Sequence, residues 1–588
     1  MPVAAAVESP LQLLYIDANI GGSSGGHVAV KLHDAVYHYQ NAEGITRLTR
    51  DSWNRFRFVY NDLENRNIHI ADVSVQAADV ERIRDRLQWL LMVQNRHMDY
   101  LEALRQDQSL LEALHQRQPV AVPGIGFFSR VPLQSPSKDD LRARIEASRG
   151  PGYLPGLRAR SNRRITALAY RPPSVPDTAL GIDRYPEYPP TFSEQVSDAY
   201  THWFAASAIL EGWPLAEGRL IDAAPGSEEG QLGAQERESL SRYREQLRQA
   251  IETDLDADYI GSGAALLLAI ARYQAVSSSL KTGRLLLLDI LPPDTLSEHR
   301  LLEADSRSAL APMLARLRAL WAQHRRAFAD EPEPDETTYN RLELAASEIR
   351  ELQRAETTGQ AIRITRESGP PQGTGWALPP VRHASGRMDV ALHASAERLD
   401  RFMAAIQERY DYELITRNCV TELHEAIHSS YSEPAGIRSA LGDFLEPGAR
   451  QGFIPFRFFE LARSHYRIQS VRLLPSFRQR KLAALGASDW LARLRESNTL
   501  TARHYQAREG DSAFLLFTED AGWARPVLGS VNLAYALGAT TGGVVTAPLD
   551  RGSKLADGLR GILFSLPELA GWNIRKGSYD EMTVRAEP

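Results

Sequence analysis

Two stretches of sequence decide the fold, GGHVAVKLHDAVYHY at residues 25–39 and YELITRNCVTELHEAIH at residues 412–428. The first alternates apolar and polar residues on both sides of a short polar turn, the pattern of two half-buried antiparallel strands. The second is typical of a helix that starts at an Asn-Cys pair. The sequence therefore predicts a strand hairpin that carries His27 and His38, and a helix whose first turn carries Cys419.

Cys419 is the single cysteine of the chain. Asn418 before it is a preferred N-cap residue, which predicts that the thiol stands in the first turn of the helix. There the unpaired backbone N–H groups and the positive end of the helix dipole favour a thiolate, and such positions lower a thiol pKa from about 8.5 to roughly 3.5–7.5. The same N–H groups can bind the oxyanion of a tetrahedral intermediate. Cys419 is therefore a candidate nucleophile, and a small buried apolar side chain is the alternative that stays open.

Two histidines of the predicted hairpin are candidate partners of this thiol. His27 begins one strand directly after the glycine-rich loop at 21–26, and His38 stands on the paired strand. Side chains on paired strands can lie side by side, so that one imidazole takes the thiol proton while the other orients it. Two ordinary sheet histidines, satisfied by backbone carbonyl groups, are the alternative.

These elements in combination resemble the circularly permuted NlpC-type branch of the papain-like fold, whose members include lecithin:retinol acyltransferase and its relatives. The resemblance rests on the Gly-His strand, the second histidine, and a later Tyr-x-Leu followed by Asn-Cys at a helix start. It implies Cys419 as nucleophile, His27 as general base and His38 as its polar partner, with Asn418 and Tyr412 in supporting positions. The chain also resembles an uncharacterised bacterial envelope family with an Asn-Cys-Thr-type motif.

Two features depart from the compact members of this branch. The separation between His38 and Cys419 is far longer, which requires a large insertion between the sheet and the cysteine helix. Cys419 is followed by Val-Thr-Glu, where the lipid acyltransferases have Glu-His-Phe. The resemblance to those enzymes therefore does not assign a lipid substrate.

The chain divides into four expected regions around these elements. Strand patterns fill 10–75, and 76–384 has helical spacing interrupted by Pro-rich loops. The cysteine helix stands in 385–460, and 461–588 mixes strand patterns with short helices and Gly-rich turns. The expected fold class is α+β. It combines a permuted papain-like core (a small antiparallel sheet plus the Cys-bearing helix) with a large helical insertion and a β-rich C-terminal region.

Local patterns give finer expectations. Residues 55–60 are expected to form a strand, 118–192 a loop or lid rich in Pro, Gly and Arg, and 193–280 three helices. Met388–His393 is expected as a strand, followed by a helix with Ser395 as its N-cap. The strands expected in the C-terminal region are YRIQSVRLL at 466–474 and SAFLLF at 512–517.

A competing motif lies in the cysteine helix itself. His424-Glu425-Ala426-Ile427-His428 is a literal H-E-x-x-H, which on a helix places two histidines one turn apart, able to share a zinc ion with Glu425 as general base. The flanking residues fit a zinc-protease helix poorly, and the available third ligands, Glu433 and Glu446, lie downstream on Pro-containing segments. A helix with a polar face that carries the two histidines is the structural alternative.

The composition and charge of the chain argue against some classes of function. With a net charge of −6 and interspersed charges, the chain lacks the basic patch of a nucleic-acid partner. No apolar stretch approaches the roughly 18–20 residues of a membrane span, so we expect no transmembrane segment and leave peripheral membrane contact open. The first ten residues do not have the pattern of a signal peptide. The resemblance nevertheless implies a periplasmic or otherwise exported protein, with the cytoplasm as the alternative.

The expected function is that of a thiol hydrolase or acyltransferase that works through a thioester acyl-enzyme and needs no cofactor. The resemblance implies an amide or ester of the bacterial envelope as substrate: a peptide, a peptidoglycan stem, or a lipid or lipoprotein acyl group. A zinc metallopeptidase and a non-catalytic envelope binding or scaffold protein are the alternatives.

Overall fold

The computed structural model describes residues 11–17, 26–64, 66–129, 141–171, 180–224, 226–290, 307–358, 372–373, 379, 388–446, 452–476, 479–480, 483, 490–502, 505, 511–518, 524–571 and 576. The fold is a mixture of helices and strands, so the α+β class is confirmed. The chain forms two compact units. Unit 1 comprises 1–97, 180–186 and 405–588, and unit 2 comprises 98–179 and 187–404. Most of the expected glycine loop, 21–25, lies outside the described residues.

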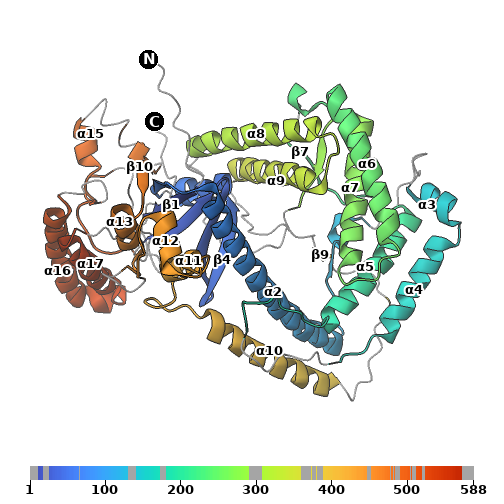
Figure 1. Cartoon of the computed structure of the whole chain (residues 1–588), viewed down its shortest axis with the longest axis horizontal. Coiled ribbons are helices and arrows are strands. Elements are labelled where there is room, and N and C mark those ends of the chain that lie inside the picture. Colours follow the sequence, from blue (N-terminus) through green and yellow to red (C-terminus); the bar gives the residue numbers. More distant parts are fainter. Residues whose placement is uncertain are drawn as a thin grey trace. The chain divides into compact units, whose positions relative to one another are not determined.

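Unit 1 is built on a six-stranded antiparallel sheet with the order β10-β5-β1-β2-β3-β4 (Figure 1). Five of its strands come from the start of the chain, where a small antiparallel sheet was predicted, and the sixth pairs with β5 from far along the sequence. The strands are β1 (Leu11–Ile16), β2 (His27–Leu32), β3 (Ala35–Ala42), β4 (Ile45–Ser52), β5 (Ile68–Val73) and β10 (Ile468–Leu474).

Helices cover both faces of this sheet. On one face, Val28 and Val30 pack in a core cluster with Val420 and Leu423 of α11 (Cys419–His428), and the start of the long helix α2 (Ala77–Gln116) joins the same cluster. The helices α12 (Pro434–Leu441) and α13 (Pro455–His465) complete this layer. The other face packs against the short α1 (Trp53–Arg57) and the π-helical turn η2 (Phe58–Leu63).

The strand expected at 55–60 is wrong, because this segment is helical. Ser52 caps α1 by accepting a hydrogen bond from the Arg55 N–H. The alternating aromatic residues that suggest a strand are one helical turn apart, and Phe56 and Tyr60 lie with ring centroids 4.6 Å apart on the buried side. The fourth strand of the sheet is instead β4, at 45–52, which was not predicted.

Unit 2 is mainly helical. The three helices expected at 193–280 are confirmed as α5 (Phe192–Glu211), α6 (Ala234–Asp254) and α7 (Ser262–Thr282). The expectation of a loop over 118–192 is wrong in part, because α3 (Leu141–Arg149) and α4 (Tyr153–Ala167) form there and bury Leu and Ile side chains. The unit also contains α8 (Arg307–Asp330) and α9 (Glu336–Thr358). Two short sheets complete its described part, one of β6 (Val122–Pro123) with β9 (Gln372–Gly373) and one of β7 (Leu220–Asp222) with β8 (Leu286–Leu288).

Two further expectations are corrected. Met388–His393 is not a strand, and Ser395 is not an N-cap, since both lie inside α10 (Met388–Tyr410), which has no breaker between them. The C-terminal region is not β-rich in its described part. Residues 466–474 supply β10, but 512–517 form no strand, and α15 (Trp490–Arg495), α16 (Arg525–Asp550) and α17 (Ser553–Leu569) follow. Of the glycines described there, Gly529, Gly543, Gly558 and Gly561 are helix positions at close contacts, whereas Gly552 and Gly571 stand in turns with positive φ, as expected.

Candidate active site

Three polar side chains of the sheet form a continuous hydrogen-bonded chain. Nε2 of His27 lies 2.9 Å from Nδ1 of His38, and Nε2 of His38 lies 3.0 Å from Oδ2 of Asp51. They stand on the neighbouring strands β2, β3 and β4. The register pairs His38 with Thr49, so Asp51 is its diagonal neighbour on the same face of the sheet. His27 and His38 thus lie side by side, as the strand pairing predicts.

These hydrogen bonds determine which nitrogen of each imidazole carries a proton when Asp51 is ionised. A carboxylate only accepts hydrogen bonds, so Nε2 of His38 carries a proton and donates it to Asp51. Nδ1 of a neutral His38 then accepts from Nε2 of His27. The basic nitrogen of His27 is therefore Nδ1, oriented by two further groups as the base of a catalytic triad is oriented by its third member.

Aromatic rings enclose the two imidazoles. Tyr60 stacks on His27 with ring centroids 5.5 Å apart, and Phe56 meets His38 edge to face at 5.1 Å. Both histidines are buried. Burial disfavours the imidazolium and, with the neighbouring His38 and Arg66, holds the pKa of His27 well below its usual 6.5. His27 is therefore neutral, and able to accept a proton, at neutral pH.

Asn418 holds the start of the cysteine helix α11. Its Oδ1 accepts from the backbone N–H groups of Val420 and Thr421 at 2.8 and 3.1 Å, and its Nδ2 donates to the carbonyl oxygens of Leu414 and Phe453. Its own N–H donates to Oγ1 of Thr421, which completes a capping box. The predicted N-cap is confirmed, and the first turn that carries the thiol is held from both sides.

The surroundings of Cys419 keep its thiol protonated. The residue is partly exposed and packs against the core cluster of α11 and the sheet. Burial raises the pKa of the thiol to about 11, while the backbone N–H groups of Val28, Cys419 and Val420 and the charge of Arg66 act in the opposite direction. Burial raises the pKa of the thiol by more than the N–H groups at the helix start lower it, so the expected lowering of the pKa is wrong. The resting site holds a protonated thiol and a neutral imidazole.

Val28 is next to both the thiol and the hydrogen-bonded histidines, because it follows His27 directly in β2. Its backbone N–H is one of the groups that favour the Cys419 thiolate. The β2–β3 ladder pairs Val30–Leu32 with Ala35–Tyr37, so His27 and Val28 lie beyond its last pair. Among the described residues, no hydrogen bond joins the thiol to the His27 ring. The His27 and His38 rings pack with Phe56 and Tyr60 on the face of the sheet opposite to α11, so direct proton transfer from the thiol to His27 requires a rearrangement at the start of β2 and not a side-chain rotation alone.

Tyr412 lies close to the thiol. It is half-buried, and its backbone N–H donates to the carbonyl oxygen of Gly44 at 2.7 Å. Burial, and secondly the neighbouring Cys419, raise the pKa of its hydroxyl. The structure thus brings Tyr412, Asn418 and Cys419 together at one end of α11.

Three residues of the site were not predicted: Asp51, Tyr60 and Arg66. The available signal for Asp51 was the strand alternation of 45–52, which places it beside the histidine strand. Arg66 is almost fully buried over the ring of Tyr60, 5.4 Å from its centroid, and its Nε donates to the Asp17 carbonyl oxygen at 2.6 Å. Its charge lowers the pKa of both Cys419 and His27, and no local sequence pattern marks it.

The H-E-x-x-H residues lie further along α11 and do not form a metal site in the described part of the chain. The rings of His424 and His428 are buried with centroids 3.6 Å apart, whereas Glu425 is exposed. No group of three His, Cys, Asp or Glu side chains among the described residues could hold a metal ion. Burial lowers the pKa of His424 to about 4 and that of His428 to about 3, so both rings are neutral at neutral pH.

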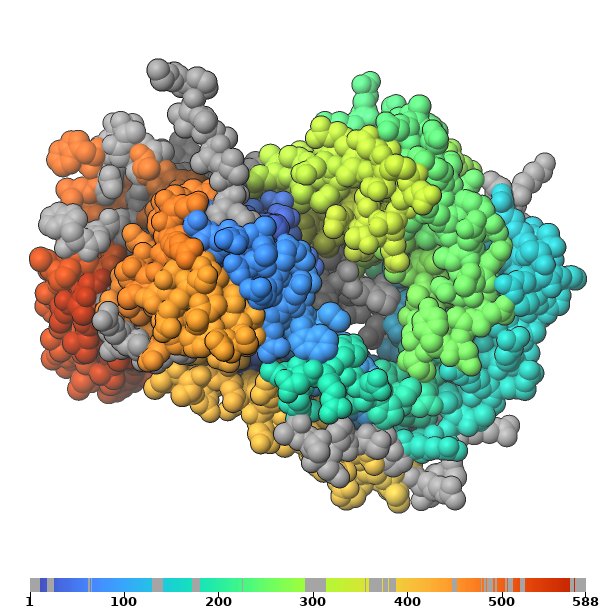
Figure 2. All heavy atoms as spheres, viewed as in Figure 1, coloured from blue at the N-terminus to red at the C-terminus, as the bar shows by residue number. Residues whose placement is uncertain are grey.

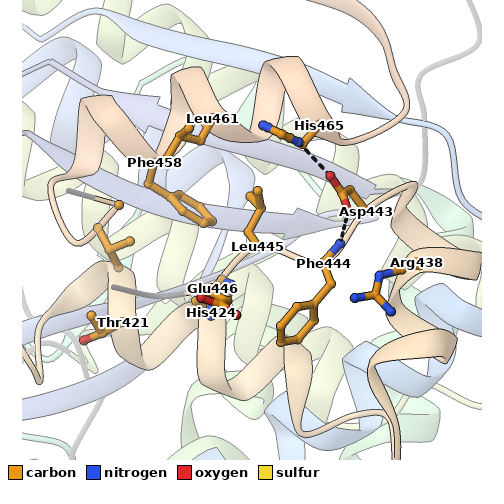
Figure 3. Close-up of a pocket in the computed structure, with 12 residues that line it drawn as sticks. Thr421, His424, Arg438, Asp443, Phe444, Leu445, Glu446, Phe458, Leu461 and His465 are labelled. Atoms are coloured by element: carbon orange, nitrogen blue, oxygen red, sulfur yellow. Dashed lines mark hydrogen bonds and ion pairs between the residues drawn. The ribbon is translucent and has the colours of Figure 1, made fainter. Parts of the chain in front are cut away.

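His424 lines a cavity of about 260 Å³ in unit 1 (Figure 3). Apolar side chains from α11, α13 and the segment between α12 and α13 form much of its wall, including Phe444, Phe458 and Leu461. At its rim, Nδ1 of His465 lies 2.7 Å from Oδ2 of Asp443. Val420 and Thr421 also line it, so the cavity lies beside the first turn of the cysteine helix.

Comparison with models of known protein families, with curated proteins and with solved structures finds no match to this chain.

Proposed function

We propose that the chain is a cysteine-dependent hydrolase or acyltransferase in which Cys419 attacks an acyl carbonyl and His27 is the general base. The polarised chain His27–His38–Asp51 carries the proposal, because it ends at the residue next to Val28, whose N–H favours the thiolate. Burying such polar groups costs stability that apolar side chains would not cost. The arrangement is therefore better explained by proton transfer than by packing.

Because the Cys419 thiol and the His27 imidazole are both neutral at rest, the reaction begins with a proton transfer between them. His27 removes the thiol proton as the sulfur attacks the carbonyl carbon, a C–S bond forms, and the carbonyl π electrons move to oxygen. His27 then returns the proton to the leaving amine or alcohol as the C–N or C–O bond breaks, which leaves a thioester on Cys419. Water, or an acceptor amine or hydroxyl, attacks the thioester with His27 again as base, and the thiol is restored.

Two kinds of group support the charges that develop in these steps. The backbone N–H groups of Val28 and Cys419 lie beside the sulfur and are the candidate donors to the oxyanion. The imidazolium of His27 is unfavourable in its aromatic enclosure, and Asp51 offsets this through the buried ring of His38. Such preorganised groups act most strongly where water is excluded.

The resemblance supplies the wider setting of the proposal. An antiparallel sheet with the cysteine helix on one face supports a permuted papain-like core, assembled from the start of the chain and 405–474. The proposed substrate is an amide or ester of the bacterial envelope (a peptide, a peptidoglycan stem, or a lipid or lipoprotein acyl group) and the proposed location is the periplasm or another exported compartment.

Acyl-enzyme formation tests the proposal without a known substrate. The full chain is treated with p-nitrophenyl acetate, quenched with acid, and its intact mass is measured. We expect an acetyl adduct that maps to Cys419, disappears in Cys419→Ala and forms at least about 100-fold more slowly in His27→Ala. His33→Ala is the matched control, because His33 stands on the same hairpin with an exposed side chain. Equal adduct rates in the two histidine variants would refute the role of His27.

A further inference from the structure

The helices α16 and α17 form a hairpin with apolar side chains on its outside. Leu549 is 88% exposed, Val545 78% and Val527 68% in α16, and Leu563 is 62% exposed in α17. Atoms of both helices lie open on the surface in Figure 2 (red). Isolated exposed apolar residues are ordinary, but a continuous apolar surface along two helices marks an interaction site.

α16 has no charged residue between Arg525 and Asp550. A helix on the surface of a protein in water normally carries charged residues on its outer face. Here the outer positions hold Val, Leu, Ala, Gly, Ser and Thr instead, together with Tyr535 and Pro548. The exposed face of α16 is therefore suited to an environment that does not solvate charge.

The hydroxyl groups of α16 are satisfied within the helix. Oγ of Ser530 donates to the carbonyl oxygen of Pro526 at 2.8 Å, and Oγ1 of Thr541 donates to that of Leu537 at 2.9 Å, one turn back in each case. Both hydroxyl groups belong to the surface part of the helix. The same bonds form in helices of this chain with charged outer faces, such as α6, where Oγ of Ser241 donates to the carbonyl oxygen of Arg237, so they are compatible with a lipid surface but do not mark one.

Two polar side chains of the hairpin point inward. Asn532 and Glu568 are fully buried, and Nδ2 of Asn532 lies 3.4 Å from Oε2 of Glu568. Glu568 also forms an ion pair with the buried Lys576 and accepts a hydrogen bond from Thr518. The hairpin thus buries part of its polar groups and exposes apolar side chains, a distribution that suits contact with lipid better than contact with water.

Glycines let the two helices approach closely. A Cβ at Gly543 would lie 2.5 Å from the backbone nitrogen of Leu555, and one at Gly529 would lie 2.5 Å from Cβ of Glu568. The contact therefore depends on small residues, as in helix pairs that associate without a hydrophobic driving force.

The hairpin turn carries two exposed cations, Arg551 and Lys554, beside the half-buried Asp550 that ends α16. Among the described residues, no helix is both long and apolar enough to cross a membrane. An apolar helix face next to exposed cations suits the interface of a bilayer, where the apolar face enters the acyl boundary and the cations meet anionic headgroups.

We propose that the α16–α17 hairpin is a membrane-docking element that lies in the interfacial layer of a bilayer containing anionic phospholipids. A protein partner fits the surface less well, because protein interfaces are enriched in aromatic residues and Arg and carry direct hydrogen bonds. This surface offers mostly aliphatic residues, glycine and hydroxyls that are already bonded, with Tyr535 as an exposed aromatic side chain. The proposal does not depend on the chemistry of Cys419.

Vesicle flotation of the full chain tests the proposal. The vesicles are phosphatidylcholine alone or with phosphatidylglycerol. We expect the protein to float with the anionic vesicles, and roughly tenfold less protein to float for the double variant Val545→Glu/Leu563→Glu. The matched control is Val390→Glu/Leu414→Glu, two residues with similar exposure outside the hairpin, which keeps the wild-type level. Thermal melting verifies that each variant folds.

The outcomes separate the alternatives. Arg551→Glu/Lys554→Glu is expected to abolish the preference for anionic vesicles. No flotation with either vesicle would overturn the proposal, and so would equal flotation of the hairpin variant and the control. If size-exclusion chromatography shows an oligomer that the hairpin variant loses, and no vesicle binds, the surface is a contact between copies of the chain.

Discussion

The ring of His38 meets that of His27 edge to face, with centroids 5.1 Å apart and planes at 85°, so that Nδ1 of His38 lies 2.9 Å from Nε2 of His27. This geometry makes His38 a positioning residue, because its second nitrogen is held by Asp51. The direction of the hydrogen bonds, and not only their presence, determines which nitrogen of His27 is basic.

Replacing Asp51 by Asn is expected to reverse that direction. The introduced amide can donate to Nε2 of His38, which then donates from Nδ1 to His27 and leaves the proton of His27 on its other nitrogen. We expect acetylation of Cys419 to slow by roughly 10²–10⁴-fold with little change in fold. Arg55→Gln, which removes an ion-pair partner of Asp51 at 3.3 Å, is the control and should change the rate far less.

Alkylation by iodoacetamide should report the raised pKa of Cys419. Only the thiolate reacts, and the pKa is about 11, so the rate is expected to rise about tenfold per pH unit from about pH 7 to pH 10. His27→Ala should leave this profile nearly unchanged, because it removes a neutral ring. A plateau below about pH 8 that His27→Ala abolishes would show instead that the pair rests as thiolate and imidazolium.

The cap at Asn418 is expected to stabilise the cysteine helix. Asn418→Ala removes both hydrogen bonds to backbone N–H groups and should lower the free energy of unfolding by about 1–2 kcal/mol, measured by urea denaturation. Asn418→Asp keeps the acceptor but loses the donors to Leu414 and Phe453, so we expect an intermediate loss. If Asn418→Asp proves as damaging as Asn418→Ala, the donated hydrogen bonds are the ones that matter.

Acid should destabilise the protein in part through His424. Burial lowers its pKa in the folded state to about 4 from the usual 6.5, so between these two values the unfolded chain takes up a proton that the folded chain does not. The stabilisation is therefore complete above about pH 6.5 and is lost as the pH falls through this window. His424→Phe should reduce the loss of unfolding free energy between about pH 7.5 and pH 4.5 by roughly 2 kcal/mol. An unchanged difference would show that the ring is protonated in the fold.

Local pattern predicted much of the sheet and the cysteine helix, because strand alternation and the Asn cap are signals within a few residues. It failed at 55–60, where aromatic residues one turn apart imitate a strand, and at α10, where no breaker separates two expected elements. It also failed in the C-terminal region, where glycines that suggest turns serve close helix packing. In each case tertiary contact decides between two local structures that the sequence permits.

The candidate site, like the fold, could be predicted from the sequence only in part. His27, His38 and Cys419 could be named from sequence because their elements carry recognisable signals. The pKa of the thiol could not, since it depends on how deeply α11 packs against the sheet, and that depth outweighs the helix start. Arg66 and Tyr60 join the site through long-range packing, which leaves no mark in the neighbouring residues.

The pairing of β10 with β5 has a consequence for synthesis on the ribosome. Roughly 400 residues separate Val73 from Leu474, so at about 5–20 residues per second the first five strands wait roughly 20–80 s for their sixth. Most of the chain of unit 2 is made in that interval. We therefore expect unit 2 to fold first and the nascent edge at β5 to be the stage of biogenesis most exposed to aggregation and most dependent on chaperones.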